Sequence, residues 1–189
     1  MRQIHVKSKQ TEQATHWTPP GHKLCGTIPF VLTIGQQFED YGAHHRTPGN
    51  KLFHRIGIPM IMFSLIGLLA RLVLLHGRGW QLDAAMLLIA AAELFYLALN
   101  WRLAVAMLLV SVAFYFGAQH VPIWLLVTLF ILGWIAQFVG HGVYEKRRPA
   151  FMRNLVHLLI GPLWILNDVV PVVPAKLPEV SSSPNVQPL

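Results

Sequence analysis

The sequence predicts an all-α fold, a polytopic membrane helix bundle with four or five transmembrane helices. Of its 189 residues, 54% are hydrophobic and only 12% are charged, and the mean hydropathy is +0.48. A soluble domain has about twice that share of charged residues, roughly a quarter. The apolar residues also gather in runs about as long as a helix that crosses a bilayer. Composition and run length together therefore exclude an ordinary soluble domain.

Five apolar runs follow a polar N-terminal segment. The first four are predicted to cross the membrane, because about 20 helical residues span about 30 Å of hydrocarbon. These four runs are residues 56–75, 83–100, 103–118 and 121–140. Arg71, inside the first run, is expected to extend toward the far interface. The fifth run, 155–173, contains Gly161-Pro162 and Asn167-Asp168, so a crossing, a re-entrant segment and an interfacial helix all stay open.

The ends of the chain differ from its centre. Residues 1–35 form a polar extension without an initial apolar stretch, so a cleaved signal peptide is not expected. Residues 36–173 are predicted to be a membrane-embedded catalytic domain, and 174–189, rich in Pro and Ser, a disordered tail. The single cysteine, Cys25, excludes an intramolecular disulfide and any cysteine-based metal site.

Basic residues in the loops predict the orientation of the bundle. They gather in three loops that share one side if the runs alternate: residues 46, 51 and 55, then 102, then 146–148 and 153. The positive-inside rule places this side in the cytosol. The formal net charge of +7 is therefore explained by topology and by contact with a lipid bilayer, and no nucleic-acid partner is expected.

The first candidate segment precedes the first apolar run. It carries three histidines and one amide side chain, which are His44, His45, His54 and Asn50. The Pro48-Gly49 pair predicts a turn between His45 and the helix that holds His54.

The second candidate segment closes the fourth run. Gln137, His141 and Glu145 are four residues apart, so they share one face of a helix. Glu145 is a candidate metal ligand or general base, and an ion pair with Arg148 is the alternative. Gln137, like Asn50, is a candidate for orienting ligands through hydrogen bonds. Helix pairing and turn formation explain these two amides equally well.

Alternating topology brings these two segments and the start of the fifth run to one membrane face. The candidate metal ligands there are His44, His45, His54, His141 and His157. Neutral imidazoles beside a carboxylate suit a first-row metal such as Fe(2+), whereas the lack of thiolates argues against an iron–sulfur cluster. As alternatives, His44 faces solvent and His157 caps the membrane surface. His76 and His120 fall on the opposite side and are excluded from the site.

Two sequence blocks resemble the 2-hydroxy fatty acid dioxygenase family of the endoplasmic reticulum and its bacterial relatives. They are residues 45–59, HRTPGNKLFHRIGIP, and residues 134–150, WIAQFVGHGVYEKRRPA. The resemblance covers roughly residues 38–166. The N-terminal extension and the Pro-rich C-terminus have no counterpart in it, and the resemblance leaves the family position of His157 unassigned.

The resemblance implies an oxidoreductase that uses Fe(2+) and O2 to shorten a 2-hydroxy fatty acid by one carbon, which is fatty acid alpha-oxidation. It also implies iron ligands at His45, His54 and His141, with His157 as a further ligand and Glu145 as a fourth ligand or a base. The active site would face the cytosol, in the inner membrane of a bacterium or the endoplasmic reticulum of a eukaryote. A homo-oligomer is compatible with this interpretation.

Two other classes of function stay open. A histidine-box hydroxylase or desaturase with a di-iron centre also places histidines at the cytosolic ends of helices. Such enzymes, however, carry HxxxH and HxxHH patterns that this chain lacks. A non-enzymatic lipid-binding membrane protein predicts no bound metal.

Overall fold

The computed structural model describes residues 33–146 and 155–173. Within these ranges most residues are helical, which confirms the predicted all-α membrane helix bundle. The helices are α1 (Ile34–Ala43), α2 (Pro48–Leu69), α3 (Ala84–Leu99), α4 (Trp101–Gln119), α5 (Ile123–Val139) and α6 (Val156–Val169). The π-helix η1 (Gly140–Glu145) continues α5, and a hairpin of β1 (Val73–Gly77) and β2 (Trp80–Asp83) joins α2 to α3. The predicted extension and tail, residues 1–35 and 174–189, lie almost entirely outside the described residues and stay predictions.

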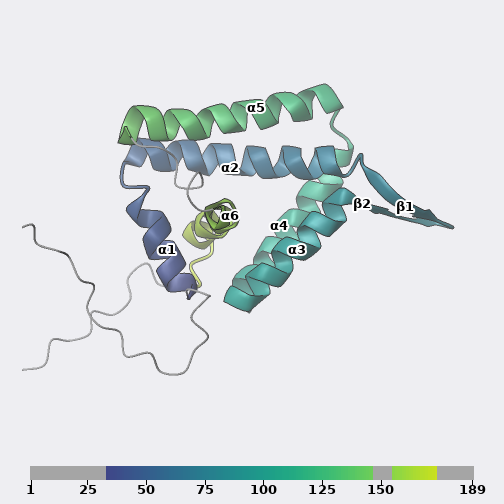
Figure 1. Ribbon diagram of the computed structural model, residues 1–189, viewed down its shortest axis with the longest axis horizontal. Helices are drawn as coiled ribbons and strands as arrows, with labels where there is room; N and C mark the ends of the chain where they lie inside the picture. Colours follow the sequence, from purple (N-terminus) through teal and green to yellow (C-terminus); the bar gives the residue numbers. More distant parts are fainter. Residues whose placement is uncertain (1–32, 147–154, 174–189) are drawn as a thin grey trace, which may run out of the picture. The chain divides into compact units, whose positions relative to one another are not determined.

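Helices α2 and α5 lie side by side and run in opposite directions (Figure 1). Gly57 and Gly133 permit this close contact, since a Cβ on Gly57 would lie 2.9 Å from the carbonyl oxygen of Gly133. Small residues commonly allow helix backbones to approach in this way within membranes. Because α3 and α4 connect the far ends of α2 and α5, the start of α2 and the end of α5 lie at the same end of the bundle.

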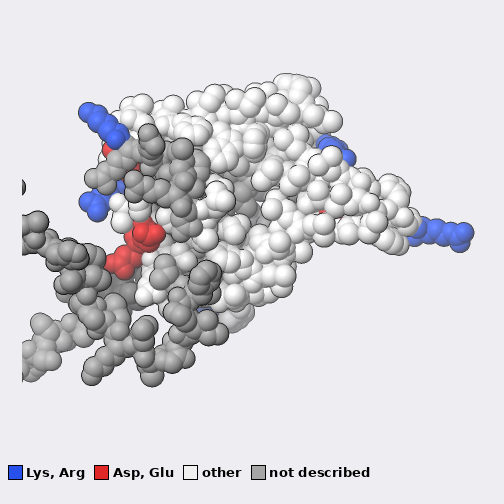
Figure 2. Space-filling view, in the orientation of Figure 1, with Lys and Arg blue, Asp and Glu red and all other residues white. Residues whose placement is uncertain are grey.

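Among the described residues, three helices are long and apolar enough to cross a membrane: Pro48–Leu69, Trp101–Gln119 and Ile123–Glu145. The other two apolar helices, α3 and α6, have 16 and 14 residues, fewer than a perpendicular crossing needs. On the face shown in Figure 2, the visible charged side chains lie mainly toward the two ends, and most of the surface between them is uncharged. A membrane protein follows from these features, while the number of crossings stays a prediction.

The predicted end of the first crossing was wrong, because residues 56–75 do not form one helix. Helix α2 ends at Leu69, and Val73–Gly77 pairs with Trp80–Asp83 in an antiparallel hairpin. Gly79 supplies the turn with a φ of +81°, a left-handed conformation that favours glycine. Arg71 donates to the carbonyl oxygens of Ala118, Gln119 and Val121 at the end of α4. Its side chain therefore links the ends of two helices instead of extending alone toward the interface.

Hydrogen bonds from two tyrosines link the remaining helices. Asp83 caps α3 through the Met86 amide and accepts a 2.6 Å hydrogen bond from the Tyr115 hydroxyl on α4. Tyr96 on α3 donates to the Leu159 carbonyl oxygen on α6. Helix α6 also contacts α1, α2 and α4, so it closes the bundle at the end where α1 lies.

Candidate metal centre

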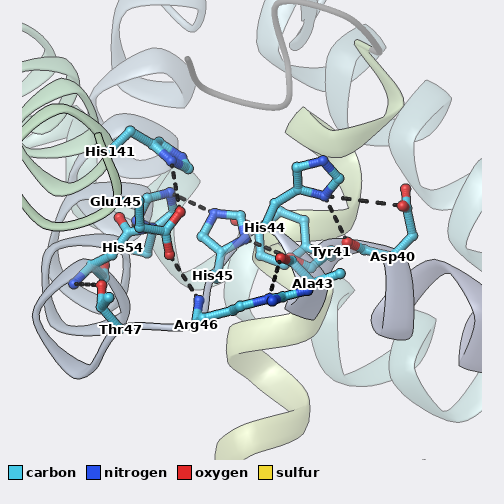
Figure 3. Close-up of polar contacts among 11 residues, drawn as sticks. Asp40, Tyr41, Ala43, His44, His45, Arg46, Thr47, His54, His141 and Glu145 are labelled. Carbon is cyan, nitrogen blue, oxygen red and sulfur yellow. Dashed lines mark hydrogen bonds and ion pairs between the residues drawn. The ribbon is translucent and has the colours of Figure 1, made fainter. Parts of the chain in front are cut away.

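Three histidines from separate segments meet inside the bundle. His45 follows α1, His54 lies in the second turn of α2, and His141 lies in η1. Each is only 2% exposed, and their ligand nitrogens lie within 4.8 Å of one another. The close-up in Figure 3 shows the three rings pointing toward one another. The structure thus brings together three of the five histidines that the sequence suggested as ligands.

Backbone hydrogen bonds determine which nitrogen two of these rings present. The Nδ1 atom of His45 lies 2.6 Å from the Tyr41 carbonyl oxygen, and that of His54 lies 2.9 Å from the Asn50 carbonyl oxygen. A carbonyl oxygen only accepts, so each Nδ1 carries the proton and each Nε2 has a free lone pair. The two Nε2 atoms are 3.0 Å apart. Two lone pairs at this distance repel unless a cation lies beside them, so the pair fits a metal ion.

The third ring, His141, is oriented by a carboxylate. Its Nδ1 lies 3.5 Å from one oxygen of Glu145, whose other oxygen accepts a 2.8 Å hydrogen bond from the Arg46 amide. Glu145 therefore joins η1 to the segment before α2 and holds His141 against the other two rings. A carboxylate behind a metal-binding histidine is a common arrangement, because it fixes the ring and makes it a stronger donor. The π-helical turn is itself a feature that occurs often at functional sites.

The surroundings keep His45 neutral. Burial, together with the neighbouring His54 ring, lowers the pKa of His45 to about 3. The imidazole is therefore unprotonated at physiological pH, as a metal ligand must be. Tyr41 stacks on His45 with ring centroids 4.0 Å apart. Burial, with a contribution from Glu145, raises the pKa of Tyr41, so its phenol stays uncharged beside the site.

His44 and His157 lie outside this group and share another partner, Asp40. His157 donates through Nε2 to an Asp40 carboxylate oxygen at 2.9 Å, and His44 donates through Nδ1 to the Asp40 carbonyl oxygen at 2.9 Å. The two rings are 5.8 Å apart, and Tyr41 contacts both His157 and His45. Asp40 was not among the site residues predicted from the sequence. It precedes His44 by four residues, a spacing that places two side chains on the same face of a helix and could have indicated the contact.

The two candidate amides each lie one turn before a ligand histidine. Asn50 is fully buried, and its backbone carbonyl holds His54. Gln137 precedes His141 by four residues, lines the adjoining cavity, and has an Nε2 without a hydrogen-bond partner among residues 33–146 and 155–173. A buried donor of this kind is costly unless a ligand accepts from it. The arrangement therefore fits a site that takes a polar group.

The turn predicted at Pro48-Gly49 was wrong. Pro48 is the first residue of α2, where its missing N–H costs nothing and its fixed φ suits a helix. Thr47 caps this helix by accepting from the Asn50 amide. The chain turns earlier, between α1 and Thr47, which brings His45 back over His54.

A cavity of about 350 Å³ adjoins the three histidines. Its walls come from six helices, α1 to α6, and its lining is mainly apolar. This volume lies within the range of small-molecule sites in proteins.

The chain is similar to known proteins over most of its length. Residues 31–171 match a family described as "2-hydroxy-palmitic acid dioxygenase Mpo1-like". A curated relative, 2-hydroxy-palmitic acid dioxygenase MPO1 of Saccharomyces cerevisiae, is 34% identical over 137 residues, 72% of this chain and 79% of the relative. No solved structure matches the chain. The matched range contains all three clustered histidines, and the chain belongs to the Mpo1-like family, as its two sequence blocks had indicated.

Proposed function

We propose that this chain is an Fe(2+)-dependent dioxygenase that shortens 2-hydroxy fatty acids by one carbon at the cytosolic face of a membrane. The observation that carries the proposal is the buried group of His45, His54 and His141 beside a mainly apolar cavity. Family membership and the printed name of the yeast relative support the activity and the substrate class.

The three imidazoles would hold the iron. A ligand set of three neutral nitrogens leaves coordination positions open, and an iron ion held there would supply the redox chemistry that links O2 to the substrate. The reaction balances if a 2-hydroxy acid and O2 give the acid one carbon shorter, carbon dioxide and water. Zinc accepts similar nitrogen ligands, but it has no redox chemistry to offer this reaction.

The chain's own residues would position the reactants. Glu145 and the carbonyl oxygens of Tyr41 and Asn50 fix the three rings, so these groups would act through the ligands. Gln137 lines the cavity one turn from His141, and its amide would donate a hydrogen bond to the hydroxy-carboxylate end of the substrate. The Tyr41 ring, stacked on His45, would exclude water from one side.

The competing classes lack a specific observation in their favour. A di-iron hydroxylase or desaturase needs a second set of ligands, and the described part of the chain contains one group of three metal-binding side chains. A non-enzymatic lipid-binding protein needs no metal ion, so this class of function does not explain why the Nε2 lone pairs of His45 and His54 face each other.

The decisive test uses the purified protein in detergent. We expect about one iron per chain after anaerobic purification, and conversion of 2-hydroxypalmitate with O2 into the acid one carbon shorter. Protein from which iron has been removed should form no product, and Fe(2+) should restore activity whereas Zn(2+) should not. Product formation by the metal-free protein, or equal restoration by Zn(2+), would reject the iron-dependent reaction.

A further inference from the structure

One face of α2 leads from the metal centre into the bundle. The residues of α2 that line the cavity are His54, Ile58, Ile61, Met62, Leu65 and Ile66. They recur every three or four positions, so they form a single stripe along the helix. Between His54 and Ile66 this stripe rises about 18 Å at 1.5 Å per residue. The cavity therefore begins at the histidines and extends well past the polar site.

The far part of the cavity is mainly apolar and borders a packed cluster of core residues. Ile66 belongs to a buried cluster with Ala70, Ala85 and Tyr115, against which Ile89 of α3 packs. Ile66 and Ile89 also line the cavity, so this cluster blocks its extension beyond α2 and α3. Ser111 of α4, only 5% exposed and one turn before Tyr115, lines the cavity too.

Polar groups are concentrated at the opposite end. His45, His54, His141 and Gln137 lie together near the metal centre, whereas the stripe beyond His54 on α2 is entirely aliphatic or Met. A space with mainly apolar walls favours hydrocarbon over water, because burial of apolar surface is favourable. The occupant that fits has a polar head at the histidines and a linear apolar tail.

We infer that this cavity is an acyl-chain channel with a fixed end, and that Ile66, Ile89 and Ser111 determine the chain length of the fatty acid. The inference rests on the proposed function for the identity of the head group. The length limit itself comes from the packed cluster that borders the far part of the cavity.

Two variants with opposite effects test the inference. Ile66→Ala deepens the channel, so the preferred 2-hydroxy acid should become longer by about two carbons. Ser111→Leu fills the end of the channel, so the preferred acid should become shorter. We expect the relative affinity for two chain lengths to change by about tenfold in each case, a typical effect of one methylene in an apolar pocket. Ile131→Ala is the matched control, since this residue on α5 is 52% exposed on the outer face.

Binding and turnover are measured separately. Affinities for 2-hydroxy acids of increasing length come from displacement of a fluorescent fatty acid without oxygen, and product formation is then measured with oxygen. Opposite shifts in the binding profiles of the two variants, with none in Ile131→Ala, support the channel. If both variants keep the wild-type length profile, or if Ile131→Ala shifts it equally, the channel is rejected. Shifted binding without product from any acid would instead reject the proposed reaction and keep the channel.

Discussion

The five histidines at one end of the bundle form two groups with different partners. In the metal group, His45 and His54 each donate Nδ1 to a backbone carbonyl, which leaves both Nε2 atoms facing each other. In the second group, the Asp40 carboxylate already occupies Nε2 of His157. The comparison shows that the hydrogen-bond partner of each ring determines which nitrogen it presents. His157 donates through Nε2, so its free nitrogen is Nδ1, and this ring is not part of the group of three that could hold a metal. The predictions below test this distinction.

The largest effect is expected from removing a ring of the metal group. His54→Ala and His141→Ala should each lose bound iron and reduce product formation by more than about 100-fold. Mutation of a residue that only orients a metal ligand lowers metal affinity or activity by about 10- to 100-fold. These two rings are proposed ligands, so their loss should have a larger effect. Iron content and turnover are measured on the same preparations. His120→Ala, at the end of α4 remote from the cluster, is the control. Full iron content in either variant would remove that ring from the centre.

Metal removal should destabilise the protein. A ligand that binds only the folded state at about 100 times its dissociation constant stabilises that state by about 2.7 kcal/mol. We therefore expect a chelator to lower the thermal midpoint of the wild-type protein in detergent. The same chelator should leave the midpoint of His54→Ala almost unchanged. A wild-type midpoint that does not respond to chelation would contradict a bound metal.

A smaller effect is expected at the carboxylate behind His141. Glu145→Gln keeps an oxygen that accepts from the Arg46 amide but removes the negative charge beside His141. Iron affinity should fall by about 10- to 100-fold, measured by competition with a chelator of known affinity. With saturating iron, much of the turnover should return. If excess iron restores nothing, Glu145 acts directly on the substrate or oxygen, as a base would.

The smallest effect on metal content is expected in the second group. His157→Gln should retain the iron content of the wild type, because its ring is held by Asp40 outside the cluster. Asp40→Asn should behave in the same way. If His157→Gln loses as much iron as His54→Ala, the two groups belong to one metal site and the distinction between them is wrong.

Much of the fold followed from the pattern of apolar residues. Runs of about 20 apolar residues predict helices in a membrane, since each backbone polar group must be paired within its own segment there. The apolar pattern did not predict the β-hairpin, because an apolar strand such as Val73–Gly77 has the same composition as the end of an apolar helix. Its glycine turn and the contacts of Arg71 with the end of α4 depend on the folded chain.

The sequence by itself determined that histidines from three distant segments could lie at one end of a helix bundle. Alternation of the runs and the spacing of Gln137, His141 and Glu145 were sufficient for that. Only the tertiary structure decided which rings meet. The close packing of α2 on α5 at Gly57 and Gly133 sets the distance between His54 and His141, and Asp40 holds His157 elsewhere. These arrangements depend on contacts between residues far apart in the chain, which the local sequence pattern does not predict.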